Sequence, residues 1–143
     1  MKVIEGGGDR YFLALEKGDK IVESITRFAE KKKLRGGFVS GIGAITNVEI
    51  GYYNLEEKKY QKKKFSQGDY ELLSLHGNIT QNEGNYFTHV HLTMGSKDYS
   101  VIGGHLFEAE VAVVAEIFVT PLGALPKREH NRQVGLNTVC GIV

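Results

Sequence analysis

The chain contains 143 residues, a length that fits a single domain over residues 1–143. Its composition, 41% hydrophobic and 24% charged with a net charge of +1, excludes a disordered chain and an overall basic nucleic-acid binder. No apolar run approaches the ~20 residues of a membrane-spanning helix, and residues 1–10 lack the apolar segment of a secretory signal. We therefore expect a cytoplasmic protein without a membrane contact. Its single cysteine, Cys140, has small and apolar neighbours and is expected to be a packed, unreactive thiol.

A strand and then the one clear helix are predicted near the start of the chain. Aromatic and aliphatic residues over 10–16 predict the strand. Asp19 is the expected N-cap of the helix, whose apolar residues, Ile25 and Phe28 among them, recur at the spacing of one buried stripe. Lysines followed by Gly36 indicate its end.

Most of the remaining chain alternates between strands and short turns. Predicted strands cover residues 37–54 (with a glycine-punctuated bend), 60–66, 70–80, 86–94, 99–102, 108–120 and 134–143. The segment 127–132 is charged and is predicted to be solvated.

The segment 108–120 is the most apolar of these strands, which predicts burial on both of its faces. Glu116 is the exception within it. A carboxylate in such surroundings needs a partner, which can be a cation, a metal or a hydrogen-bond donor.

These elements predict an α+β domain with a largely antiparallel sheet of about seven to eight strands and one main helix. One helix covers only part of such a sheet. We therefore expect the uncovered apolar face to mediate self-association.

Three of the five histidines lie between residues 86 and 105. In a strand, the two-residue period of side chains places His89 and His91 on the same face. A turn near residues 95–98 and a short returning strand would bring His105 back beside them. Three ring nitrogens around one point suit a transition metal, although two histidines on a strand are also common on a polar, partly exposed face. The two glycines before His105 fit a turn or a close backbone approach to an ion.

Five segments, in this order, resemble the PPC domain, the plants-and-prokaryotes-conserved domain. They are Gly36–Ala44, Tyr70–Ile79, His89–Leu92, Gly103–Leu106 and Ala115–Ile117. The resemblance covers nearly the whole chain. It implies an α+β fold, a homotrimer, a metal site at His89, His91 and His105, and a DNA-binding or regulatory role. The Arg-Gly-Arg-Pro core of the AT-hook in the plant proteins is absent, and His76 stands where a small polar residue is expected, which leaves its membership of the site open.

Zinc is the metal that this ligand set favours, because three neutral imidazoles with one open position form a common catalytic zinc site; nickel, iron or copper would also fit. Glu116 is a candidate general base, a fourth ligand or an acceptor that orients an imidazole, or else it forms a salt bridge to Arg128 or to a neighbouring subunit. His130 is expected at the surface or an interface.

Three functions remain open from the sequence. The first is a metal-binding PPC protein that contacts DNA or has a regulatory role. The second is a zinc-dependent hydrolase, or another small-molecule metalloenzyme, that acts on an unknown substrate. The third is a structural metal that holds a trimer together. Basic clusters at 31–35, 58–64 and 127–132 are expected to be a helix end, an edge guard and a solvated loop, although a trimer would gather them into a phosphate-binding surface.

Overall fold

The computed structural model describes residues 1–6 and 10–142, which form one helix and nine strands. The elements are β1 (Lys2–Gly6), β2 (Arg10–Glu16), α1 (Ile21–Lys32), β3 (Gly37–Asn54), β4 (Lys59–Phe65), β5 (Tyr70–Asn82), β6 (Asn85–Gly95), β7 (Val101–Pro121), β8 (Pro126–Asn131) and β9 (Leu136–Ile142). The predicted α+β class and the single helix are confirmed. Strand β1 was not predicted.

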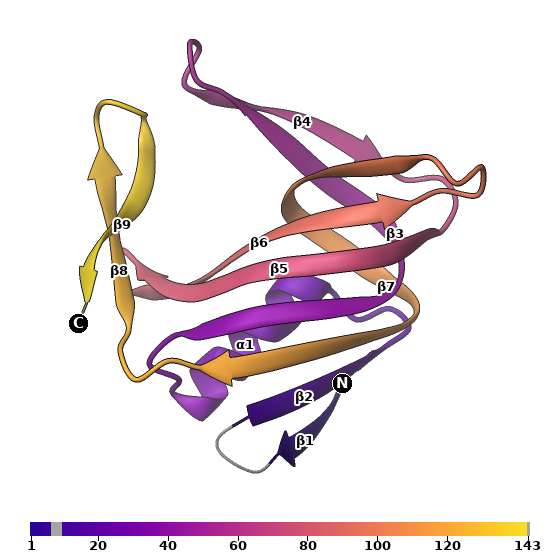
Figure 1. Cartoon of the computed structure of the whole chain (residues 1–143), viewed down its shortest axis with the longest axis horizontal. Helices are drawn as coiled ribbons and strands as arrows, with labels where there is room; N and C mark the ends of the chain where they lie inside the picture. The colour runs from indigo at the N-terminus through magenta and orange to yellow at the C-terminus, as the bar shows by residue number, and fades with distance from the viewer. Residues whose placement is uncertain (7–9, 143) are drawn as a thin grey trace.

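The nine strands form one strongly bent sheet (Figure 1). Its order is β1-β2-β7-β3-β5-β8-β9, with β4 paired to β3 and with β6 paired to both β5 and β7. All pairings are antiparallel except a short parallel one between β5 and β8. Because β7 also pairs with β3, and β3 with β5, the strands β3, β5, β6 and β7 close a ring of pairings. The register of β7 on β3 shifts three times, and such bulges bend a strand.

Helix α1 covers one face of this sheet (Figure 1) and buries Ile21, Ile25, Phe28 and Ala29 there. Its apolar residues recur at helical spacing, so one stripe packs on the core while lysines and glutamates face solvent. In the described part of the chain, no helix is long and apolar enough to cross a membrane.

The prediction that Asp19 caps α1 was wrong. The N-cap is Lys20, which has no capping side-chain bond, and Asp19 instead accepts a hydrogen bond from the Glu16 N–H at 2.9 Å. The capping carboxylate comes from β7. Glu108 accepts hydrogen bonds from the N–H groups of Val22 at 2.8 Å and Glu23 at 3.1 Å, and so ties the helix start to the sheet.

Strand β7 differs from its prediction in two ways. It is one 21-residue strand rather than two separate strands at 99–102 and 108–120. Its C-terminal half is not buried on both faces: Ala115, Ile117 and Val119 are buried, whereas Glu116 and Phe118 are exposed on the face without the helix. The apolar run therefore marks a second, uncovered apolar face.

This uncovered face carries large apolar side chains from several strands. Phe38 is 47% exposed, and Ile42 and Phe118 are each 54% exposed. Phe12 packs edge-on against Phe118, with ring centroids 4.9 Å apart. Patches of this kind are typical of protein interfaces, so self-association stays a prediction for this face.

The C-terminal hairpin β8–β9 stands at one end of the sheet (Figure 1). We expected a terminal strand over 134–143 that buries its apolar residues. Strand β9 instead leaves Val139 and Ile142 exposed, Cys140 is an exposed free thiol, and Val143 lies outside the described residues.

Candidate metal centre and adjoining pocket

The β6–β7 hairpin brings three histidines together. His89 and His91 project from the same face of β6, and His105 lies directly opposite His91 in the β6–β7 pairing. One nitrogen from each ring lies within 4.8 Å of the others. Among the described residues, this is the group of three that could hold a metal ion.

The rings have the spacing that a metal needs. Their centroids are 5.2 Å apart for His89 and His91, 5.1 Å for His89 and His105, and 5.3 Å for His91 and His105. The Nε2 atoms of His89 and His91 are 3.3 Å apart. Two ligands at 2.0–2.1 Å from a tetrahedral zinc ion lie about 3.3 Å apart. The pair is therefore spaced for one shared ion.

His105 has an unsatisfied nitrogen. It is 9% exposed, and its Nδ1 is the one buried side-chain nitrogen or oxygen without a hydrogen-bond partner in the described part of the chain. Its ring packs against Tyr60 at 5.0 Å and Phe107 at 4.8 Å between centroids. Buried polar atoms are rarely left without a partner, so the donor set fits a bound metal ion.

The electrostatics keep the His89 and His105 imidazoles neutral. Burial, with smaller effects from Arg128 and His91, lowers the pKa of His89 to about 4. Burial also lowers the pKa of His105 to about 4, with further effects from the neighbouring histidines, Arg128 and Lys62. A metal binds a neutral imidazole, so neither ring has to lose a net proton before it binds a metal at neutral pH.

Glycines allow the strands to approach closely around the histidines. A Cβ atom on Gly77 would lie 1.9 Å from the carbonyl oxygen of His89, so only glycine fits there. A Cβ on Gly103 would lie 2.8 Å from the Leu92 carbonyl oxygen. Gly103 and Gly104 lie within β7, so the alternative of a turn was wrong. The close approach at Gly103 is to the backbone of β6, and an approach to an ion stays a prediction.

Arg128 lies beside the histidines although it comes from the distant strand β8. It is 8% exposed, and in the metal-free protein its Nη2 donates to His89 Nδ1 at 3.0 Å. A metal on His89 Nε2 would require the ring proton on Nδ1, so this hydrogen bond would be lost when the metal binds. It also donates to Thr80 Oγ1 at 2.9 Å, to Asn78 Oδ1 at 3.2 Å and to the Asn137 carbonyl oxygen at 3.2 Å. The guanidinium therefore links β8 and β9 to β5 and β6.

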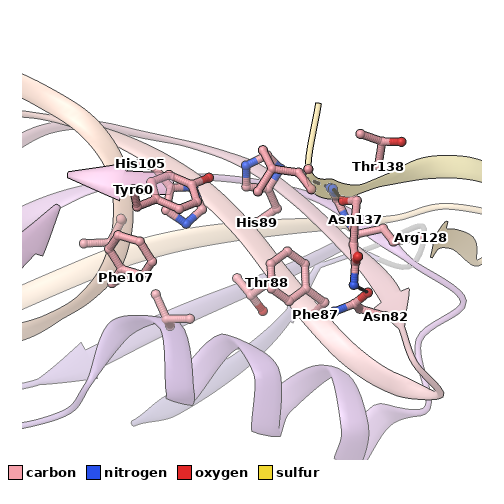
Figure 2. A pocket seen from close by; sticks show the side chains of 14 residues that line it. Tyr60, Asn82, Phe87, Thr88, His89, His105, Phe107, Arg128, Asn137 and Thr138 are labelled. Carbon is pink, nitrogen blue, oxygen red and sulfur yellow. Dashed lines mark hydrogen bonds between the residues drawn. The ribbon is translucent and has the colours of Figure 1, made fainter. Parts of the chain in front are cut away.

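A cavity of about 540 Å³ opens beside His89 and His105. Figure 2 shows His105, Tyr60 and Phe107 on one side of it and Arg128 and Asn137 on the other, with His89 between them. Its wall combines apolar and polar side chains from α1, β4, β5, β6, β7 and the C-terminal hairpin. The lining residues are Val22, Tyr60, Asn82, Phe87, Thr88, His89, His105, Leu106, Phe107, Arg128, Gly135, Leu136, Asn137 and Thr138.

Glu116 does not lie with the histidines in this chain. It is exposed opposite Ile42 in the pairing of β7 with β3. Strands β3 and β5 lie between that part of β7 and β6, so Glu116 is three strands from β6, or about 14 Å across the sheet. The suggested salt bridge to Arg128 is not formed, because the Arg128 guanidinium binds Thr80, Asn78, Asn137 and His89 instead.

The other two histidines stand apart from the group. His76 lies opposite His91 on β5 but hydrogen-bonds Ser74 Oγ at 2.6 Å and is not one of the three converging rings. His130 is exposed, with its Nδ1 3.3 Å from Asn137 Oδ1.

Comparison with known proteins agrees with this arrangement. A family model, the Plants and Prokaryotes Conserved domain, matches residues 3–123. The chain belongs to this family. No curated protein sequence matches the chain.

Solved structures extend the likeness of this PPC protein over nearly its whole length. A metal-containing protein from Archaeoglobus fulgidus is 37% identical, with a TM-score of 0.87 and coverage of 98% of this chain and 99% of the other. A PPC protein from Pyrococcus horikoshii is 33% identical, with a TM-score of 0.83 and 93% of each chain covered. A Bacteroides thetaiotaomicron protein, named a "putative dna binding protein", is 28% identical, with a TM-score of 0.92 and coverage of 98% and 96%.

Sequence reasoning missed the polar wall of the pocket in this PPC protein. Arg128 lies in a charged segment that we predicted to be solvated, and Tyr60 lies in a strand that we predicted to be a solvated edge. The placement of Arg128 depends on the long-range pairing of β8 with β5, which no local pattern reveals. Tyr60 lies in the local β3–β4 hairpin, and what the local pattern does not show is the contact of its ring with His105.

Proposed function

We propose that this PPC protein binds a divalent transition metal through His89, His91 and His105, and that the metal is zinc. The observation that carries the proposal is the 3.3 Å separation of two facing Nε2 atoms, with a third ring at the same centroid spacing. The metal-containing relative from A. fulgidus supports it. When bound, such an ion supplies Lewis acidity beside the cavity.

Elemental analysis of protein purified without added metal tests this site. We expect about one metal ion per chain, and its loss when His89 or His105 is replaced by alanine. His130→Ala is the matched control and should keep the metal. His76→Ala decides whether that residue joins the site. A metal content that survives both His89→Ala and His105→Ala would contradict the proposal.

A DNA-binding or regulatory role is the second part of the proposal, and it rests on the name of the B. thetaiotaomicron relative. The basic clusters give it limited support, because Lys59, Lys62 and Lys127 each pair with a glutamate. Mobility shifts on duplex DNA at two salt concentrations test it. Phosphate-driven binding should appear at low salt and weaken as salt rises, and the role is excluded if nothing binds at low salt.

A small-molecule metalloenzyme, such as a zinc-dependent hydrolase, is the alternative that the cavity favours, since His89 and His105 both line it. Glu116 remains the proposed base or acceptor, and because it lies three strand positions away, a second copy of the chain would have to supply it. Glu116→Gln should then abolish turnover of a substrate found by screening while metal content is unchanged.

A structural metal is the remaining alternative, in which the ion stabilises the proposed trimer. Chelation followed by light scattering separates it from the others. Dissociation on chelation favours a structural ion, whereas an assembly that persists without metal favours binding or catalysis.

A further inference from the structure

Arg128 is a buried positive charge whose hydrogen-bond partners in the described part of the chain are all neutral. Its four hydrogen bonds end on a hydroxyl, an amide, a carbonyl and an imidazole, all of which are neutral. None of the ion pairs in the described part of the chain includes it. Burial lowers the pKa of the guanidinium, yet arginine stays protonated in proteins. A buried charge of this kind normally requires a counter-ion.

Among the described residues, none that lines the cavity beside Arg128 is an aspartate or a glutamate. Glu83 touches the lining residue Asn137 at 3.3 Å, but it is exposed and accepts none of the Arg128 hydrogen bonds. The side of the cavity that holds Arg128, His89 and Asn137 is therefore positive or neutral (Figure 2).

Hydrogen-bond donors remain available for a ligand on this wall. Arginine has five N–H groups, and the four bonds above leave one N–H of Nη1 without a protein partner in the described part of the chain. Thr138 and Tyr60 add hydroxyl groups to the wall.

The rest of the wall is apolar. Phe87, Phe107 and Leu136 line it, and the Arg128 guanidinium lies 5.2 Å from the centre of the Phe87 ring. A volume of about 540 Å³ is in the range of small-molecule sites.

We propose that this cavity binds a small organic oxyanion, a carboxylate or phosphate on an apolar body, with Arg128 as the residue that selects its charge. The oxyanion accepts from Arg128 and the apolar body packs against Phe87, Phe107 and Leu136. This site goes beyond the metal site and does not require it. A divalent ion at the three histidines adds positive charge to the same cavity and should strengthen binding.

Calorimetric titration of the full chain at low ionic strength, metal-free and zinc-loaded, tests the proposal. The probes are benzoate and phenyl phosphate, with benzyl alcohol as a neutral probe of similar size. In the metal-free protein, we expect at least one oxyanion to bind about tenfold or more tightly than benzyl alcohol, because a hydrogen bond to a charged group contributes that much affinity. In the zinc-loaded protein, we expect the same oxyanion to bind more tightly still. The preferred probe shows whether a carboxylate or a phosphate is selected.

The matched variants are Arg128→Gln and Arg132→Gln, the second at an exposed arginine of the same segment. Arg128→Gln should weaken oxyanion binding about tenfold or more, and Arg132→Gln should leave it unchanged. Binding that Arg128→Gln does not alter, benzyl alcohol bound as tightly as benzoate, or no oxyanion binding in either form would each overturn the proposal. If Arg128→Gln does not fold, amide shifts of the wild-type protein decide: shifts at Phe87 and Thr138 on adding the better oxyanion probe support the site, and shifts elsewhere overturn it. Metal content is measured separately, so failure of the metal site is distinguished from failure of this one.

Discussion

At the scale of single residues, the neutral histidines make stability depend on pH. In the metal-free protein His89 and His105 have pKa values of about 4, below the ordinary 6.5 of histidine. Between these values the unfolded chain binds more protons than the folded chain, so the free energy of unfolding falls as the pH drops from 7 towards 4. Urea unfolding at several pH values in a chelator should show this fall. A His89→Gln/His105→Gln double variant should lose less unfolding free energy over the same pH range, whereas His130→Gln should lose as much as the wild type. An equal dependence on pH in all three proteins would contradict the prediction.

Gly77 is a residue whose replacement should disturb the site without removing a ligand. The Cβ atom of an alanine at position 77 would meet the His89 carbonyl oxygen, so β5 and β6 would have to separate beside His89, a proposed metal ligand. We expect Gly77→Ala to lower the free energy of unfolding by about 1–3 kcal/mol and to reduce metal content. Gly123→Ala is the control, because its Cβ atom would meet no heavy atom within 4 Å. Urea titration and elemental analysis measure the two effects, and an unchanged Gly77→Ala variant would refute the steric argument.

At the scale of elements, Glu108 joins the helix to the strand that carries His105. Its carboxylate replaces the local N-cap that α1 lacks. Glu108→Ala should lower the free energy of unfolding by about 1 kcal/mol or more, because two helix N–H groups lose their acceptor. Glu110→Ala, which removes only an exposed contact to Asn47, should have a smaller effect. Thermal unfolding of both variants tests the ranking, and the reverse order would contradict it.

Sequence patterns predicted which side chains meet within one hairpin, but not which side chains meet between distant elements. The strand period placed His89 and His91 on one face, and a short hairpin then placed His105 opposite them, because both inferences concern neighbours along the chain. The cap by Glu108 and the packing of Arg128 on His89 join residues 86 and 39 positions apart, which a local pattern does not encode. The apolar run around Glu116 predicted burial on both faces of the strand. It indicates instead an apolar sheet face that nothing in this chain covers.

At the scale of the whole molecule, the uncovered face predicts the assembly. Phe118 lies on this face beside Phe12, and burying such side chains in the proposed trimer would stabilise it by about 1.5–3 kcal/mol for each one. Phe118→Asp should therefore give monomers in light scattering, whereas Tyr52→Asp, at an exposed position of β3, should keep the wild-type mass. A wild-type protein that is monomeric at high concentration would refute the prediction.

The origin of all three proposed metal ligands in one hairpin also affects the order of folding that we expect. His89 and His105 are only 16 positions apart, so their loop closes at low entropic cost, and a metal can bind them before the rest of the chain has folded. Such early binding also reduces the stabilisation that the metal gives to the native state, because the unfolded chain shares part of the affinity. The proposed oxyanion cavity needs β4, β5, β6, β7 and the C-terminal hairpin together, so we expect it to form late in folding. In refolding experiments, metal capture should therefore precede anion binding.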